Sequence, residues 1–133
     1  MAEKEIRTWS MLCHLAALCG LLFAAISPFV VVTSPMVAIC AILGPLIVWL
    51  LKRNDHPTID ANGREAVNFQ LSVLIYTWVL GLIGALTLIL LIGFAFLGAA
   101  ALVAILGFVF AIVGAVKASH GVDYRYPFTI RFL

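Results

Sequence analysis

The chain has 133 residues, of which 65% are hydrophobic and 11% are charged, and its formal net charge is +2. An ordinary soluble domain carries about 25% charged residues, and a chain this short buries only part of so much apolar surface in a water-soluble core. The composition therefore indicates a protein whose main partner is the lipid bilayer, and the small net charge excludes nucleic acid as an expected partner.

Two long segments contain no Lys, Arg, Asp or Glu: residues 8–51 and residues 66–116. A helix that spans a bilayer needs roughly 20 mostly apolar residues, so each segment is long enough for two spans and a tight turn. We therefore expect one all-α domain over residues 1–133, an integral membrane protein with four transmembrane helices arranged as two hairpins.

The first expected hairpin joins a helix over about residues 8–31 to a helix over about residues 36–51, through the turn TSP. The preceding segment AEKEIR carries two glutamates, unlike the basic start of a cleaved signal peptide. We therefore expect the first helix to remain in the protein as a transmembrane span. Trp49 is expected near a membrane interface, where indole rings are favoured.

A polar loop, residues 52–62, separates the two expected hairpins. Asn62, followed three residues later by Glu65, fits a helix N-cap, so the third helix is predicted over about residues 63–92. The turn GFAFLG leads to a fourth helix, predicted over about residues 99–118.

The tail, residues 119–133, contains VDYRYPFTIRFL, in which apolar and polar residues alternate. This period of two, together with Pro127, argues against a helix. We expect an extended segment at the membrane surface, with its aromatic side chains toward the lipid. Its backbone groups could pair with residues 55–60, with the tail of another copy, or with water.

The basic residues all fall on one side of a four-span chain. The N-terminus, the polar loop and the tail share that side, whereas the turns TSP and GFAFLG contain no Lys or Arg. The positive-inside rule places this side in the cytoplasm, so we expect a multi-pass protein of the cell membrane with both termini cytoplasmic. Five basic residues form the expected face for a partner or for lipid head groups: Lys52, Arg53, Arg64, Arg125 and Arg131.

Polar residues also enter the expected membrane from this charged side. In the third helix they form a narrow stripe, because their spacing of i, i+3, i+7 and i+11 keeps them on one helix face: Glu65, Asn68, Ser72 and Tyr76. In the first helix, Ser10 and His14 follow Arg7 at i+3 and i+7. We expect the two sets to face each other, with His14 within reach of Asn68 or Ser72.

Two interpretations of this polar stripe stay open. Polar side chains can simply hold helices together in lipid. Alternatively, ionisable groups inside a membrane face protein interiors or water-filled cavities, so the stripe could line a polar pocket that opens to the cytoplasm.

The sequence contains no motif for catalysis. No nucleophile–base pair, HExxH or Gly-rich phosphate loop is found among the ionisable residues of the charged side: His56, Asp60, Arg64, Glu65 and His120. The cysteines are odd in number and lack the spacing of metal ligands, so we expect buried thiols: Cys13, Cys19 and Cys40. We expect no catalytic residue, no metal and no cofactor.

Small residues recur in the fourth helix, and small-xxx-small spacing lets helices approach closely: Gly107, Ala111, Gly114, Ala115 and Ala118. This pattern fits a homo-oligomer and packing within one chain equally well.

Several segments together resemble a known family: MLCHLAAL at 11–18, GPLIVWLLKR at 44–53, the polar loop through EAVNFQ at 65–70, and YRYPFTIRFL at 124–133. The chain looks like a member of a family of small four-helix bacterial membrane proteins, mostly uncharacterised. That family is grouped with the twenty-kilodalton subunit of the chloroplast inner-envelope (Tic) protein import machinery. The resemblance implies the four-helix topology and, by analogy with the chloroplast subunit, a contribution to a protein-conducting channel.

The leading functional hypothesis is therefore a non-catalytic, small, oligomeric membrane protein that is channel-like or associated with protein translocation. The alternative is a structural or accessory subunit that docks a membrane-protein partner through its polar cytoplasmic face. An enzyme is the third hypothesis.

Overall fold

The computed structural model describes residues 2–26 and 35–133. These residues form four α-helices and one short 3₁₀ helix: α1 (Glu3–Ile26), α3 (Pro35–Lys52), α4 (Pro57–Leu86), η1 (Leu88–Leu90) and α5 (Gly93–Ser119). No strand occurs among them, so the prediction of an all-α fold with four helices is confirmed for the described part of the chain.

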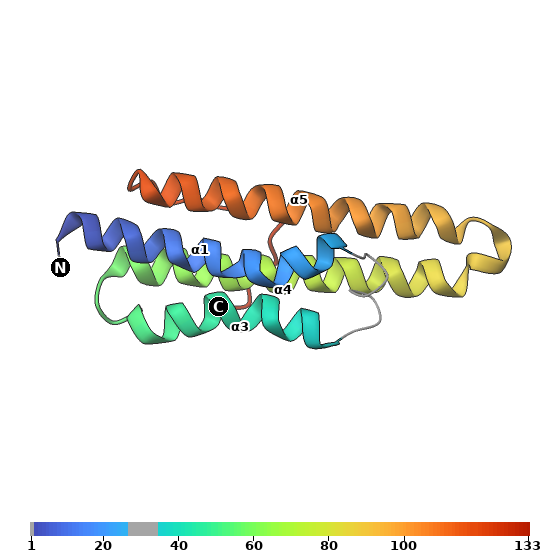
Figure 1. Cartoon of the computed structure of the whole chain (residues 1–133), viewed down its shortest axis with the longest axis horizontal. Helices are drawn as coiled ribbons and strands as arrows, with labels where there is room; N and C mark the ends of the chain where they lie inside the picture. Colours follow the sequence, from blue (N-terminus) through green and yellow to red (C-terminus); the bar gives the residue numbers. More distant parts are fainter. Residues whose placement is uncertain (1, 27–34) are drawn as a thin grey trace.

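The four helices run side by side along the long axis of the molecule (Figure 1). α1 contacts α3, α4 and α5, and α4 also packs against α3 and α5. The start of α1, the loop between α3 and α4, and the end of α5 lie at one end of the bundle. At the opposite end, the hairpin of α4 and α5 extends well beyond α1 and α3 (Figure 1).

Two apolar clusters stabilise the half of the bundle that holds the N-terminus. In the first, Cys13 of α1 packs with Ile59 and Ala66 of α4. In the second, Phe69 and Val73 of α4 pack with a tail residue that the sequence did not single out, Tyr126. The small residues of α5 are all buried within the single chain: Gly107, Ala111, Gly114, Ala115 and Ala118. Packing within the monomer therefore accounts for their pattern.

Two helices of the described part are long and apolar enough to cross a membrane, α4 and α5. The described side chains of α3, from Ile39 to Lys52, form an apolar helix shorter than a span. This finding supports two spans and not the four that the sequence analysis expected. Side chains of α1 are described only up to residue 18 and those of α3 only from residue 39, so the comparison of lengths covers part of these two helices.

The start of α4 was predicted incorrectly. The helix begins at Pro57, and its N-cap is His56, whose Nδ1 accepts a hydrogen bond from the N–H of Thr58 at 3.2 Å. Asn62, the predicted N-cap, is a buried residue in the second turn. A proline at the first helical position has no N–H to leave unpaired, so the helix can start inside the polar loop.

Other boundaries differ from the predictions as well. α1 begins at Glu3, five residues before the predicted start, and α5 begins at Gly93, inside the predicted turn. The chain turns instead around Leu91, which adopts a positive φ of 59°. The predicted end of the first helix near residue 31 and the turn residues 33 and 34 lie outside the described residues.

The cysteines do not behave alike. Cys13 is buried as predicted, whereas Cys40 is exposed on the outer face of α3, so the expectation of a buried thiol was wrong there. The side chain of Cys19 lies outside the described part of the structure.

Candidate functional site: the polar stripe and the C-terminal tail

The polar stripe of α4 is covered by the chain's own C-terminal tail. After α5, the tail turns back and runs toward the middle of the bundle (Figure 1). Asn68 and Ser72 are each only 1% exposed. The tail therefore covers most of these two side chains, although Glu65 and Asn68 still border a hollow beside the tail and Ser72 and Tyr76 border a second one.

The stripe contacts the tail mainly through the tail's backbone. The Oδ1 atom of Asn68 accepts hydrogen bonds from the N–H groups of Phe132 and Leu133, at 3.0 and 3.2 Å. The hydroxyl of Ser72 accepts the N–H of Ile130 at 2.8 Å. Polar groups that the tail could not pair with itself are thus satisfied by α4.

The two ends of the stripe hold the tail at different depths. At the outer end, Oε1 of Glu65 accepts the N–H of Tyr126 at 2.8 Å and lies 3.2 Å from Nη2 of Arg131. At the inner end, the hydroxyl of Tyr76 donates to the carbonyl of Phe128 at 2.9 Å. These end residues are eleven positions apart, which corresponds to roughly 16 Å along a helix.

The order of these contacts shows that the tail dips inward and returns. It passes Glu65 at Tyr126, reaches Tyr76 at Phe128, and comes back to Asn68 at Phe132. The reversal occurs at Phe128, which has a positive φ of 57°. The tail is non-helical on either side of this turn, as expected. Of its expected backbone partners, residues 55–60 are replaced by the stripe residues Glu65, Asn68 and Ser72.

His14 of α1 lies at the junction of α1, α4 and the tail. Its ring is fully buried, with Nε2 3.0 Å from Oδ1 of Asn62 and Nδ1 2.7 Å from the hydroxyl of Tyr126. Asn62 also donates through Nδ2 to the carbonyl of Thr58 at 2.9 Å and to Oδ1 of Asp123 at 2.8 Å. These two donor contacts orient the amide so that its oxygen faces the histidine.

This orientation assigns the proton of the neutral histidine. Because the Asn62 oxygen can only accept, Nε2 of His14 carries the hydrogen and donates it. Nδ1 is then the acceptor for the hydroxyl of Tyr126. Burial raises the pKa of that hydroxyl above its ordinary value, which keeps it protonated as the donor.

The predicted partner of His14 was therefore wrong. We expected His14 to contact Asn68 or Ser72, but the hydroxyl of Tyr126 forms the hydrogen bond with Nδ1 of His14 instead. Ser10, the other predicted residue of α1, is 1% exposed, and its hydroxyl has no hydrogen-bond partner among the described residues. Asn62 could have been assigned to the polar stripe from its spacing, since it lies three residues before Glu65 on the same helix.

The predicted basic face divides into two groups. Lys52 and Arg53 lie over the rings of Trp9 and Trp49, at 4.9 and 5.6 Å from the ring centroids. The other three arginines line one hollow of about 460 Å³ beside the tail: Arg64, Arg125 and Arg131. Arg64 pairs with Asp60 at 2.6 Å and Arg131 with Glu65, so most of this charge is balanced locally.

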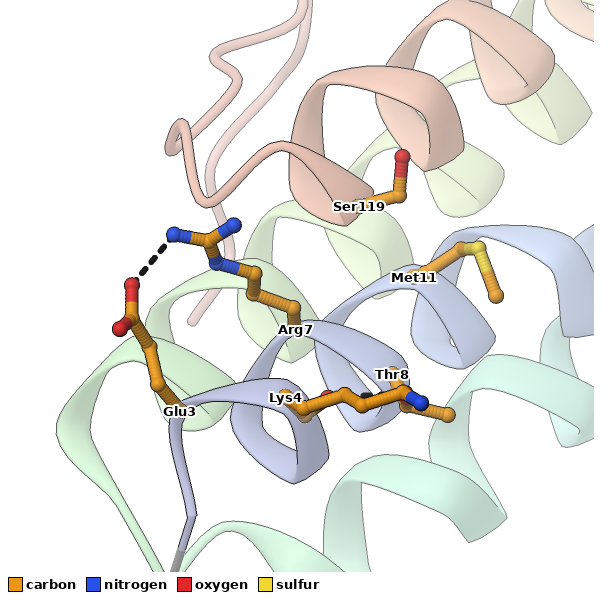
Figure 2. A pocket seen from close by; sticks show the side chains of 6 residues that line it. All are labelled: Glu3, Lys4, Arg7, Thr8, Met11 and Ser119. Carbon is orange, nitrogen blue, oxygen red and sulfur yellow. Dashed lines mark hydrogen bonds and ion pairs between the residues drawn. The ribbon is translucent and has the colours of Figure 1, made fainter.

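A second hollow, of about 550 Å³, lies between the first turns of α1 and the end of α5 (Figure 2). Figure 2 shows Arg7 directed toward Glu3, with which it forms an ion pair, while Lys4 lies along the other side of α1. The polar groups here do not converge on one point. Among the described residues, no group of three or more His, Cys, Asp or Glu side chains could hold a metal ion.

Comparison with known proteins gives one match. The sequence model of the magnetosome magnetite crystal formation protein family matches residues 5–133, nearly the whole chain. No curated protein and no solved structure matches the chain. The match supports the expected membership of a small bacterial family, but it does not support the expected grouping with the chloroplast import subunit.

Proposed function

The chain belongs to the magnetosome magnetite crystal formation protein family, and from this premise we propose that it is a non-catalytic, multi-pass membrane protein that supports magnetite crystal formation. In this proposal it acts as a structural or accessory component of a membrane. The observation that favours this role over a channel is the covered polar stripe. Its side chains bind the tail of the same chain, so within the described residues these polar groups pair with protein instead of being left free for an ion or a polypeptide.

The proposal includes four membrane spans. α4 and α5 expose large apolar side chains along their length, including Leu82, Leu86 and Ile105. α1 packs against both of these helices, and α3 packs against α1 and α4. Helices that lie alongside two spans and share their direction would share the bilayer with them. The charged end of the bundle then lies in the cytoplasm with both termini, as the positive-inside rule requires.

The charged end is the surface that such a component would use to dock a partner. It carries the hollow lined by Arg64, Arg125 and Arg131, and arginine is enriched at protein interfaces. Arg125 is exposed and lies at the rim of this hollow. A partner that places an acidic group there would complement the arginines without disturbing the buried contacts of His14.

The topology can be tested with single cysteines in a chain that lacks its three native ones. A cysteine at Phe96 should react with an impermeant thiol reagent from outside intact cells. A cysteine at Asn54, which is exposed in the loop before α4, should react only after the cells are opened. Labelling of the Asn54 variant in intact cells would contradict the proposed orientation.

The role can be tested in a magnetite-forming bacterium that carries this gene. Deletion should reduce crystal size or number in electron micrographs, and the wild-type chain should restore them. The variant Arg125→Ala should restore them poorly if the hollow docks a partner, whereas Lys117→Ala, an exposed basic residue on α5, serves as the matched control. Unchanged crystals after deletion would contradict the proposed role.

A channel makes a different prediction for the purified protein. Liposomes that contain the folded protein should stay tight to small ions if the accessory role holds. A steady ion flux that changes in the variant Asn68→Leu would instead favour the channel-like hypothesis from the sequence.

A further inference from the structure

We infer that residues 127–133 form a re-entrant segment that enters the cytoplasmic leaflet, contacts lipid acyl chains around Phe128 and returns toward the cytoplasmic surface, while the polar stripe of α4 pairs its backbone. This inference rests on the proposed membrane topology, and it goes beyond it by placing the tail inside the bilayer instead of above it. The role of the polar stripe would then be to pair the backbone groups of the tail within the bilayer.

The backbone hydrogen bonds of the tail are the first feature that fits a place inside the bilayer. Non-helical backbone is tolerated at membrane depth only where protein groups pair its N–H and C=O groups. In the tail, the N–H groups of Ile130, Phe132 and Leu133 and the carbonyl of Phe128 all bind side chains of the stripe. A segment that stays in water has no need of such partners, because water supplies them.

The exposed side chains of the tail are the second feature that fits contact with lipid. On the outer surface of the tail, Phe128 is 88% exposed, Phe132 is 54% exposed and Ile130 is 38% exposed. The tail thus turns its polar backbone toward the protein and large apolar side chains outward. This is the reverse of the arrangement expected for a segment in water, and it matches lipid acyl chains in chemistry.

The position of the charged groups agrees with this arrangement. Arg131 reaches back to Glu65 at the outer end of the stripe, at 3.2 Å, which is where the charge-free part of α4 begins. Long basic side chains near a membrane surface extend toward the head groups in this way. The deepest tail residue by contact, Phe128, has no charged neighbour on either side in the sequence.

The outward surface of the tail also continues the exposed apolar surface of α4 and α5. A groove of about 330 Å³ lies between Phe128 and these two helices. Its walls are mostly apolar and include Val73 of α4 with Val103 and Leu106 of α5. Lipid that covers the two helices would therefore meet the tail without crossing a polar boundary.

The experiment uses the full-length protein in liposomes, with the native cysteines replaced and one cysteine at a time carrying an environment-sensitive fluorophore. The labelled variants are Phe128→Cys in the tail, Arg125→Cys before the turn, and Val79→Cys on the exposed face of α4. Phospholipids with a nitroxide on the acyl chain or on the head group act as the quenchers.

We expect acyl-chain nitroxide to quench the label at position 128 at least twice as strongly as the label at position 125, and to a similar extent as at position 79. Head-group nitroxide should favour position 125. If position 79 is quenched but position 128 behaves like a label in water, the re-entrant tail is refuted while the membrane topology stands. If position 79 is not quenched, the proposed topology itself fails, and the inference fails with it.

A second set of variants tests the task of the stripe. In the background with a label at position 128, Ser72→Ala combined with Asn68→Leu should release the tail and reduce acyl-chain quenching. Thr77→Val changes another buried hydroxyl on α4 that has no partner among the described residues, and it should leave the quenching unchanged. Equal quenching in all three proteins would show that the stripe does not hold the tail in the bilayer.

Discussion

The hydroxyl of Tyr126 lies 2.7 Å from Nδ1 of His14, although the two residues are 112 positions apart in the chain. Through this contact the tail is fastened to α1 as well as to α4. The ring of Tyr126 also stacks on Phe69, with centroids 3.9 Å apart. A single tail residue therefore joins three segments of the bundle.

Replacement of Tyr126 by phenylalanine should destabilise the protein by about 1–3 kcal/mol, because it leaves the buried Nδ1 of His14 without a donor. The stacking surface on Phe69 is kept, so the loss reports the hydroxyl alone. The measurement is the free energy of unfolding in detergent. Tyr124→Phe is the control, since its hydroxyl bonds with none of the described residues. Equal losses in the two variants would contradict the prediction.

Two buried hydroxyls on α4 should respond in opposite ways to removal. Ser72 accepts the N–H of Ile130 at 2.8 Å, so Ser72→Ala should cost about 1 kcal/mol or more. Thr77 is similarly buried, but its hydroxyl has no partner among the described residues. Thr77→Val should therefore be neutral or slightly stabilising. Hydrogen exchange should show faster exchange of the Ile130 amide in the Ser72 variant only.

Two glycines in helices provide a matched test of packing. A Cβ atom at Gly63 would lie 2.3 Å from Cδ1 of Trp49, so Gly63→Ala should destabilise by about 1–3 kcal/mol through overpacking. A Cβ atom at Gly98 would have no neighbour within 4 Å. Gly98→Ala should instead stabilise α5 by about 0.5–1 kcal/mol, because alanine restricts the unfolded chain. Thermal unfolding of both variants distinguishes these outcomes, and a stable Gly63 variant would refute the close contact.

Alkaline pH should weaken the attachment of the tail. Burial, with smaller contributions from Tyr124 and Glu65, raises the pKa of Tyr126 above its ordinary value of about 10. The unfolded state then loses this proton before the folded state does, so the stabilisation is complete below pH 10 and is lost as the pH rises further. Urea unfolding between pH 8 and 11 should show a smaller decline for Tyr126→Phe than for the wild type.

Much of the helical framework could be predicted from charge-free segments and apolar length, and the helix ends were the weaker part. Pro57 shows why. The predicted start relied on Asn62 and Glu65 alone, but Pro57 occupies the first helical position and lets α4 start six residues earlier than predicted. Asn62 was consequently interpreted as a cap, although it faces His14 from the second turn.

The polar stripe itself could be recognised from its spacing, whereas its partner could not. Asn68 and Ser72 bind backbone atoms of residues about 60 positions further along the chain. Backbone groups are the same in every residue, so they leave no signature in the sequence. Tyr126 was missed for a related reason: within an alternating tail it could not be distinguished from Tyr124, which lies on the same side of the pattern.

Because the tail is held by its main chain, the identity of most of its side chains matters less than the presence of an amide hydrogen at certain positions. Tyr126, Ile130, Phe132 and Leu133 each donate their N–H to α4. An imino acid at any of these positions would delete one bond, and at Ile130 it would leave the hydroxyl of Ser72 without its donor. The tail's own proline, Pro127, occupies a position whose nitrogen α4 does not use, so the segment is constrained by where proline is permitted and where it is forbidden.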